Sequence, residues 1–211
     1  MSIVQRLMQD SASLGVQLSE SAAGRLLRLL QELARWNHTY NLTAIRGSER
    51  MLTHHLLDSL SIQCDLRGTQ VADVGTGAGF PGLPLAVADP DRQFTLIDSN
   101  GKKIRFVRHA VRELGLTNVD ALHARVETLE VGQPYDTIVS RALAPLPQML
   151  GQVARLCGPA TQVLAMKGKW PTAEIEALPA GWYESGSRQV LVPGLDEARC
   201  VIGLRSAAPL R

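Results

Sequence analysis

The feature that most constrains the fold is a glycine-rich loop at residues 73–79, Asp-Val-Gly-Thr-Gly-Ala-Gly, which follows a short apolar stretch. Nineteen residues after Gly79, a second apolar stretch ends in Asp98. Glycines let the chain turn sharply and approach a ligand, and a carboxylate at the end of the next strand accepts hydrogen bonds from ribose hydroxyls. The spacing therefore predicts a strand, a tight turn, a helix and a second strand that bind a nucleoside cofactor.

Strands and helices alternate after the loop. The apolar runs predict strands at 71–74, 94–97, 118–122, 135–140 and 161–166, with helices near 83–88, 102–114 and 146–156. Apolar strands separated by amphipathic helices are typical of a parallel sheet covered on both faces. Two further strands, at 188–192 and 200–205, are separated by a turn and predict an antiparallel hairpin. We expect an α/β, Rossmann-like fold with a mostly parallel sheet of seven strands.

The residues before the loop have helical periodicity. Leucines recur every three or four residues between Ser19, a candidate N-cap, and Asn37, and a second helical pattern covers residues 48–62. We expect residues 1–66 to form a helical cap on a cofactor-binding domain at 67–211. The chain of 211 residues shows no signal peptide or membrane-length apolar run, so we expect a cytoplasmic protein without a membrane partner. Its three cysteines lie far apart and predict no metal site.

The loop also satisfies the dinucleotide pattern G-x-G-x-x-G through Gly77, Gly79 and Gly82. However, Pro81 and Pro84 lie where a helix N-terminus offers N–H groups to a pyrophosphate, and proline has none. Asp73, just before the loop, suits a cationic ligand better than a pyrophosphate, and the chain is too short for a separate hydride-acceptor domain. S-adenosylmethionine, which is cationic and carries no phosphate, fits these features better than NAD.

Six stretches carry a family resemblance: Trp36 to Thr43, His55 to Ser59, Asp73 to Gly82, Asp98-Ser99 with Lys102-Lys103, Arg125 to Glu127, and Ser140 to Ala142. In their order and spacing, the chain resembles the small-subunit ribosomal RNA guanine-N7 methyltransferases, the glucose-inhibited-division B group. The resemblance implies a class I S-adenosylmethionine-dependent fold. It also implies that the substrate is a guanine in the decoding-region (530) loop of 16S ribosomal RNA, within the small subunit or an assembly intermediate, and we expect a monomer.

The candidate cofactor residues lie at the predicted C-terminal ends of strands, where open parallel sheets bind ligands. The resemblance implies contacts from Gly75, Phe80, Val126, Glu127 and Arg141. Phe80 and Val126 are candidates to pack on the adenine, and Glu127 to accept a hydrogen bond from its amine. With the loop and the second strand, the full predicted set is Gly75, Thr76, Gly77, Gly79, Phe80, Asp98, Ser99, Val126, Glu127 and Arg141.

No residue is assigned as a catalytic acid or base. Guanine N7 already carries a lone pair, so aligning the two reacting atoms supplies most of the catalysis. The sequence lacks the Pro-Cys, Asn/Asp-Pro-Pro-aromatic and cysteine-triplet motifs of other nucleic-acid methylation chemistries. His55 and Asp58 share a helix face and are either catalytic or a hydrogen-bonded polar pair, which we favour. Asn41 and Thr43 are expected to cap a turn over the cofactor.

The net charge of +2 is too small to indicate a nucleic-acid-binding protein by itself. The predicted helix at 102–114 nevertheless carries Lys102, Arg105, His109 and Arg112 along one face and has one acid, Glu113. We predict an RNA-phosphate track formed by Lys102, Arg105, Lys167 and Lys169. A solvated helix face is the simpler interpretation of these charges. A methyltransferase of another RNA site, a small molecule or a protein, and a non-catalytic cofactor-binding module, remain alternatives.

Overall fold

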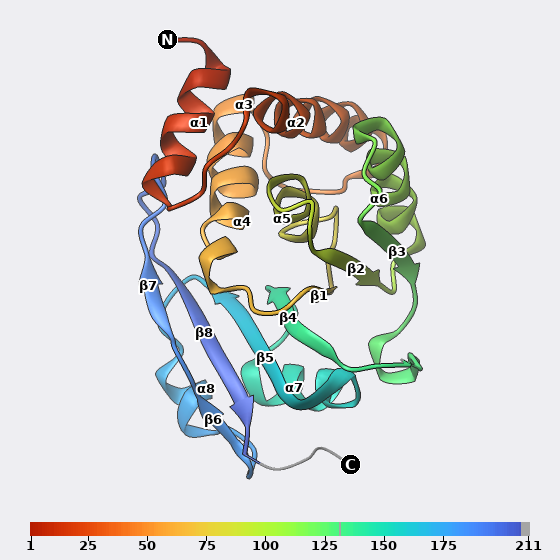
Figure 1. Ribbon diagram of the computed structural model, residues 1–211, viewed down its shortest axis with the longest axis vertical. Helices are drawn as coiled ribbons and strands as arrows, with labels where there is room; N and C mark the ends of the chain where they lie inside the picture. Colours follow the sequence, from red (N-terminus) through yellow and green to blue (C-terminus); the bar gives the residue numbers. More distant parts are fainter. Residues whose placement is uncertain (131, 208–211) are drawn as a thin grey trace.

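A computed structural model describes residues 1–130 and 132–207, so the last four residues of the predicted 67–211 domain lie outside the described residues. Within these described residues, eight strands form one sheet in the order β3-β2-β1-β4-β5-β8-β6, and β7 also pairs with β8 (Figure 1). The strands are β1 (Gln70–Val74), β2 (Gln93–Asp98), β3 (Val119–His123), β4 (Tyr135–Arg141), β5 (Cys157–Lys167), β6 (Trp182–Glu184), β7 (Arg188–Val190) and β8 (Arg199–Ser206).

The first five strands are parallel, and β8 pairs antiparallel with β5, β6 and β7. The predicted parallel sheet and C-terminal hairpin are therefore confirmed. The sheet has eight strands rather than seven because β6 was not predicted. That strand is only three residues long and lies between Gly181 and Gly186, so it has too little alternation to be recognised from sequence.

Helices cover both faces of the sheet (Figure 1). On one face lie α5 (Gly82–Ala88) and α6 (Gly101–Leu114), and on the other lie α7 (Leu146–Val153) and α8 (Thr172–Glu176). Short 3-10 turns η2 (Gln63–Asp65), η3 (Val126–Thr128) and η4 (Ala154–Leu156) complete the connections. The two faces bury separate hydrophobic clusters, one centred on Phe94 and Phe106 and the other on Leu150 and Ile202.

The N-terminal helices extend the first of these clusters. They are α1 (Ile3–Ser13), α2 (Glu20–Tyr40), α3 (Ser48–Met51), the π-helical η1 (Leu52–Leu57) and α4 (Asp58–Leu60). Helix α2 packs on α5 and α6, and its buried leucines join the same core as Leu83 and Phe106. Ser19 caps α2 as predicted. No element was predicted before Ser19. The structure nevertheless has α1 in this region, and a capping box between Ser2 and Gln5 marks the start of that helix.

The segment predicted as one helix at 48–62 is continuous but is widened in its middle by a π-helical turn. Single π-helical turns are rare and are found frequently at functional sites. The turn carries His54 and His55, and Asp58 begins the α-helical turn that follows. This widening changes which residues face the sheet, so the i, i+3 spacing expected for a regular helix does not describe their contacts.

Among the described residues, no helix is both long and apolar enough to span a membrane.

Replacing Leu29 by alanine should destabilise the fold, because its side chain is fully buried between α2 and the body. Large-to-small substitutions at such sites cost about 2–5 kcal/mol in the free energy of unfolding. Leu191→Ala is the control, since Leu191 is 90% exposed, and its effect should stay within about 0.5 kcal/mol. Urea unfolding measures both. Equal effects of the two substitutions would show that the cap does not share the core.

Candidate active site

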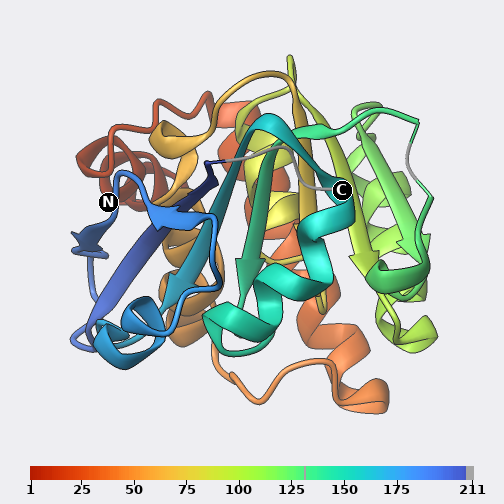
Figure 2. The same cartoon turned by 90° about the horizontal axis from the view of Figure 1, so that it is seen from below.

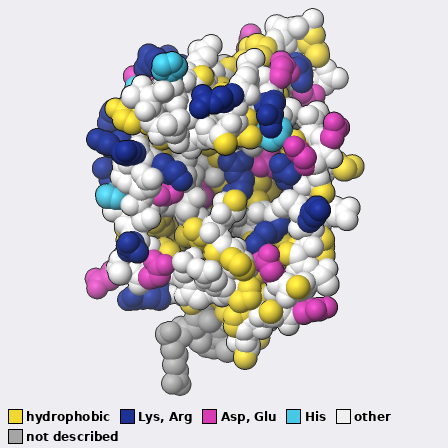
Figure 3. Space-filling model, turned by 180° about the vertical axis from the view of Figure 1, so that it is seen from behind, with side chains coloured by type: hydrophobic (Ala, Val, Ile, Leu, Met, Phe, Trp, Pro, Cys, Tyr) yellow, Lys and Arg dark blue, Asp and Glu magenta, His cyan; other side chains and the backbone are white. Residues whose placement is uncertain are grey.

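The C-terminal ends of the parallel strands meet at one edge of the sheet, where their arrowheads point the same way (Figure 2). Loops that follow these ends carry the ligand sites of open parallel sheets. Figure 3 shows the molecule from this side. The face is hollowed near its centre, and Lys and Arg side chains lie around the hollow and in a group at the side where α6 lies.

The glycine loop between β1 and α5 is held against the end of β2. The N–H groups of Gly75 and Thr76 both donate to the carbonyl of Ile97, and the Gly77 N–H donates to Oδ2 of Asp98 at 2.9 Å. Gly75 has a φ of +71°, which side chains rarely adopt, and a Cβ there would lie 2.6 Å from Cδ1 of Leu143. The backbone geometry therefore favours glycine at this position, and any larger residue would also have to displace the Leu143 side chain.

Asp73 holds this loop together from inside. Its carboxylate is fully buried, and Oδ2 accepts hydrogen bonds from the Thr76 hydroxyl at 2.6 Å and from the Gly82 N–H at 2.8 Å. Burial raises the pKa of Asp73 to about 6, although both hydrogen bonds oppose the shift. Asp73 was expected to suit a cationic ligand, but its carboxylate binds the loop and the start of α5 instead.

The start of α5 has no N–H group left for a pyrophosphate. The Gly82 N–H donates to Asp73, the Leu83 N–H donates to the carbonyl of Gly79, and Pro84 has no N–H. Phosphate groups bind at helix N-termini through such N–H groups. The geometry therefore supports the argument against a dinucleotide that the prolines suggested.

A first cavity of about 240 Å³ opens between the ends of β1, β2, β3 and β4. Its lining residues are Val74, Gly75, Ile97, Asp98, Ser99, Ala124, Arg125, Val126, Glu127, Leu143 and Gln152. Five predicted cofactor residues are thus brought together: Gly75, Asp98, Ser99, Val126 and Glu127. Leu143 and Gln152 were not predicted, because they come from the segment after β4 and from α7, outside the motifs.

The residues of this cavity fit a nucleoside. Each carboxylate oxygen of Asp98 accepts one backbone N–H, from Gly77 and from Asn100, and each retains a lone pair for a ribose hydroxyl. The Val126 side chain is buried and supplies an apolar wall. Glu127 is exposed, and its Oε1 accepts a hydrogen bond from Gln152 at 3.0 Å. The cavity thus offers acceptors for the hydroxyls of a ribose and an apolar wall for a base, which are the groups that an adenosine needs.

The remaining predicted cofactor residues lie elsewhere in the site. Thr76 and Gly79 are buried within the loop, where they shape it. Phe80 is also buried, and its ring stacks on the ring of His55 with 4.5 Å between centroids. The guanidinium of Arg141 lies 5.7 Å from the centroid of the Phe80 ring and lines a second cavity.

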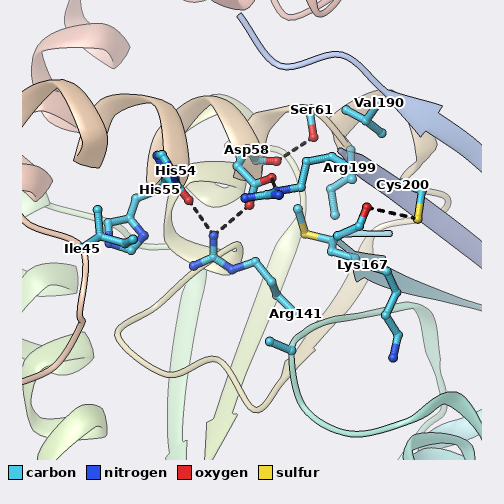
Figure 4. Close-up of a pocket in the computed structure, with 14 residues that line it drawn as sticks. Ile45, His54, His55, Asp58, Ser61, Arg141, Lys167, Val190, Arg199 and Cys200 are labelled. Atoms are coloured by element: carbon cyan, nitrogen blue, oxygen red, sulfur yellow. Dashed lines mark hydrogen bonds and ion pairs between the residues drawn. The ribbon is translucent and has the colours of Figure 1, made fainter. Parts of the chain in front are cut away.

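This second cavity has a volume of about 440 Å³ and lies between the N-terminal helices and the ends of β4, β5 and β8 (Figure 4). At its centre is Asp58, which is 3% exposed. Oδ2 of Asp58 accepts from Arg141 at 3.0 Å, and Oδ1 accepts from Arg199 at 3.1 Å. Asp58 is therefore paired with two arginines and makes no hydrogen bond to His55, the partner that its spacing suggested.

His55 contacts the loop that follows α2 instead. Its Nε2 lies 3.1 Å from Oγ1 of Thr43, and Asn37 bonds to both the N–H and the carbonyl of Thr43. Burial, together with the charge of Arg141, lowers the pKa of His55 to about 3, so the imidazole is neutral at physiological pH. The predicted turn at residues 41–43 is present, with Asn41 in the left-handed conformation that ends α2.

The predicted basic residues fall into two groups. Lys102 and Arg105 are exposed on α6, and Lys169 is exposed after β5. Lys167 is half-buried, and its ammonium donates to the Ala144 carbonyl and pairs with Glu174 at 2.8 Å. Figure 4 shows this ammonium pointing away from the arginine pair.

Not all of the residues predicted on the basic face of α6 are exposed to solvent. The imidazole of His109 contacts Glu32 of α2 at 2.7 Å, and Glu113 pairs with Arg28 of the same helix. His109 therefore faces α2 rather than solvent.

The described residues contain no cluster of His, Cys, Asp and Glu that could hold a metal ion.

Because folding raises the pKa of Asp73 from 3.8 to about 6, its folded form keeps a proton that the unfolded chain has lost. The contribution of Asp73 to stability should fall as the pH rises from about 4 to 6, by at most about 3 kcal/mol. Asp73→Asn can keep both hydrogen bonds through its oxygen but cannot ionise. Urea unfolding of both proteins from pH 4 to 7 should show wild type losing stability relative to the variant. A difference that is constant with pH would contradict the assignment.

Comparisons with known proteins agree with this geometry. The chain matches the family described as rRNA small subunit methyltransferase G over residues 22–202. A ribosomal RNA small subunit methyltransferase G of Nitrosococcus oceani is 45% identical over 91% of this chain and 90% of that protein. The protein of the same name from Xanthomonas oryzae pv. oryzae is 46% identical over 90% of both chains.

Solved structures show the same fold. A SAM-dependent methyltransferase from Aquifex aeolicus superposes with a TM-score of 0.53 at 20% identity, covering 71% of this chain and 90% of that chain. Together with the cavity that Asp98 and Val126 line, these matches assign the cofactor. The chain is a methyltransferase of Rossmann-like fold that uses S-adenosylmethionine, and it belongs to the rRNA small subunit methyltransferase G family.

Proposed function

We propose that this enzyme methylates N7 of a guanine in the 530 loop of 16S ribosomal RNA, guanine 527 in the conventional RNA numbering. The family match supports ribosomal RNA as the substrate. The observation that carries the proposal is the pair of adjoining cavities at one edge of the sheet. Arg141 and Ala142 line the second cavity, while the next residue, Leu143, lines the first. One short segment thus separates the site that fits the cofactor from a site of suitable size for an acceptor.

The chemistry needs alignment rather than proton transfer. S-adenosylmethionine supplies a methyl group on a positively charged sulfur, and the N7 lone pair displaces that sulfur as a neutral thioether. Neither His55 nor Asp58, the candidate pair in the second cavity, suits proton abstraction at neutral pH, and His54, which also lines the cavity, contacts Glu197 and the Arg50 carbonyl. His55 has a pKa of about 3, and both oxygens of Asp58 accept from arginines. These properties support an in-line displacement whose rate depends on positioning.

The exposed cations support RNA as the partner. Lys102, Arg105 and Arg108 line a hollow at the start of α6, beside the end of β2 where Asp98 lies. The nearest acid of α6, Glu113, is paired with Arg28 of α2 and lies near the far end of the helix. Phosphate groups of a bound RNA favour such a surface. N7 is poorly accessible in the deep groove of A-form RNA, so the target should lie in a loop or an opened strand.

We place the reaction in the cytoplasm, on the small ribosomal subunit or an assembly intermediate, with the enzyme acting as a monomer. The test is transfer of tritiated methyl groups from S-adenosylmethionine to small subunits prepared from cells that lack this protein. Nucleoside analysis of the RNA should yield 7-methylguanosine at one site. Label in the protein fraction, or at another RNA position, would instead assign one of the alternative substrates.

Reversing the charge of Lys102 and Arg105 should lower kcat/KM on small subunits by roughly tenfold or more, because both side chains are exposed where we place the phosphate track. The Kd for S-adenosylmethionine should stay within about twofold of wild type. Arg67→Glu is the matched control, since Arg67 is exposed just before β1, at the opposite edge of the sheet. Unchanged turnover of the double variant on small subunits would remove α6 from the RNA surface.

The rate of methyl transfer should depend little on pH. With His55 neutral above a pKa of about 3, we expect kcat to vary by less than about threefold between pH 6 and 8.5. Single-turnover measurements with saturating cofactor separate this step from product release. A rate that follows one ionisation near neutral pH would reveal a general base and contradict the proposed mechanism.

A further inference from the structure

The C-terminal end of α2 carries an exposed aromatic ring beside the basic start of α6. Tyr40 is the last residue of α2 and is 43% exposed. Figure 2 shows this end of α2, in orange, extending beyond the arrowheads of the parallel strands on the side of the molecule where α6 begins. The hydrophobic core does not require an exposed ring at this position, next to the edge of the sheet that carries the cofactor cavity.

Tyr40 is the outer end of a row of three rings. Trp36 lies between Tyr40 and His109, with centroid distances of 5.3 and 4.9 Å and an angle of 34° between the ring planes in each pair. The inner end of the row is fixed, because the His109 imidazole contacts Glu32 at 2.7 Å. Among the described residues, Trp36 is the one ring that contacts Tyr40. The exposed side of Tyr40 can therefore accept a further ring and continue the row.

The packing of α2 on α6 places Tyr40 beside the first turn of α6. Arg28 of α2 pairs with Glu113 near the end of α6. Two turns further along α2, Trp36 contacts Phe106, which lies two turns earlier in α6, so the two helices run antiparallel. One more turn in the same direction brings Tyr40 to the start of α6.

The start of α6 carries cations that the protein does not neutralise. Lys102 and Arg105 are exposed, and Lys103 is half-buried. None of the three has an acidic partner among the described residues. The surface next to Tyr40 therefore keeps a local positive charge, although the net charge of the whole chain is only +2.

We infer that Tyr40 is a stacking platform for an unpaired base of the substrate RNA that neighbours the target guanine, while the cations at the start of α6 bind the phosphates of that strand. The inference rests on the proposed function and names a contact with the RNA outside both cavities. Proteins that bind single-stranded nucleic acids combine a positively charged groove with aromatic side chains on which bases stack. Every base has such a face, so this platform selects an unpaired strand rather than a sequence.

The platform lies at the rim of both cavities. Five residues after Tyr40, Ile45 lines the second cavity. On the side of the first cavity, Lys103 reaches the glycine loop, since a Cβ built on Gly77 would lie 3.9 Å from the lysine Nζ. A base stacked on Tyr40 is therefore placed next to the site of methyl transfer, where the strand that delivers the target guanine has to pass.

The surroundings of Tyr40 favour a base over an apolar protein surface as the occupant. The exposed residues next to it in α2 and at the helix end are polar: His38, Thr39 and Asn41. Sites that bind proteins usually present a contiguous apolar patch. A single ring among polar and cationic side chains instead matches the flat face of a base and the charge of its phosphate.

The first test needs no methyl transfer. A short single-stranded RNA that contains the fluorescent base 2-aminopurine is titrated with the full chain saturated with S-adenosylhomocysteine, the product of the cofactor. Stacking quenches this base, so we expect quenching by wild type and by Tyr40→Phe. Tyr40→Leu keeps an apolar contact with Trp36 but has no aromatic face, and its affinity should be at least about fivefold weaker.

Two results of this titration would overturn the inference. One is equal quenching and equal affinity for wild type and Tyr40→Leu. The other is no quenching by wild type at high micromolar protein, because a stacking platform has to act on any unpaired base.

The second test measures methyl transfer to small subunits. We expect Tyr40→Leu to raise KM for the subunits at least about fivefold, with kcat within about threefold of wild type and the Kd of S-adenosylmethionine within about twofold. Tyr40→Phe should restore the wild-type KM. Tyr183→Leu is the matched control, since Tyr183 is 46% exposed but lies on β6, at the opposite end of the strand order from β2 and β3.

A purely structural role of Tyr40 predicts a different pattern, in which Tyr40→Leu lowers the Tm and leaves KM unchanged. That pattern, or an equal rise of KM in Tyr183→Leu, would contradict the inference. If wild type transfers no methyl group to small subunits, the proposed function fails, while the fluorescence titration still decides whether Tyr40 stacks on a base.

Discussion

The buried carboxylate of Asp73 is the interaction on which the rest of the site depends. It joins the end of β1 to Thr76 in the glycine loop and to Gly82 at the start of α5, all within a region that excludes solvent. A buried charged or polar group is costly unless it is hydrogen-bonded, so these two bonds oppose its desolvation and define the path of the loop. The loop in turn donates through Gly77 to Asp98, which fixes the carboxylate that we propose binds the ribose.

Parallel pairing brings together residues that are distant along the chain. Five strands end at one edge, so the loop after β1, Asp98 at the end of β2 and Val126 after β3 surround one cavity. The order β3-β2-β1-β4-β5 reverses direction between β1 and β4, and ligands bind in open sheets at such a crevice. Arg141 at the end of β4 and Leu143 just after it lie on the other side of that crevice, where they separate the two cavities.

The N-terminal helices are part of the site as well as a cover for one face of the sheet. Their leucines share a core with α5 and α6, and α4 packs on α5. The π-helical turn then presents the His54 carbonyl to Arg141 and stacks His55 on Phe80. Helices that served only to cover the sheet would not need polar contacts with the ends of its strands. The Asp58 pairing with β4 and β8 therefore links the stability of the cap to the geometry of the second cavity.

Local patterns in the sequence determined most of the elements and the glycine loop, because these depend on neighbouring residues. Apolar runs located all five parallel strands, Ser19 marked the start of α2, and the glycine spacing identified the loop. The elements that were missed include α1, although Ser2 and Gln5 form a capping box at its start, and β6, which has only three residues. Only the tertiary structure decided that Asp73 faces inward, that Lys167 is ion-paired, and that Asp58 meets two arginines. Asp58 lies 83 and 141 residues from those partners, and no spacing rule reaches so far. Contacts of this kind are set by how layers pack, which a single sequence does not display.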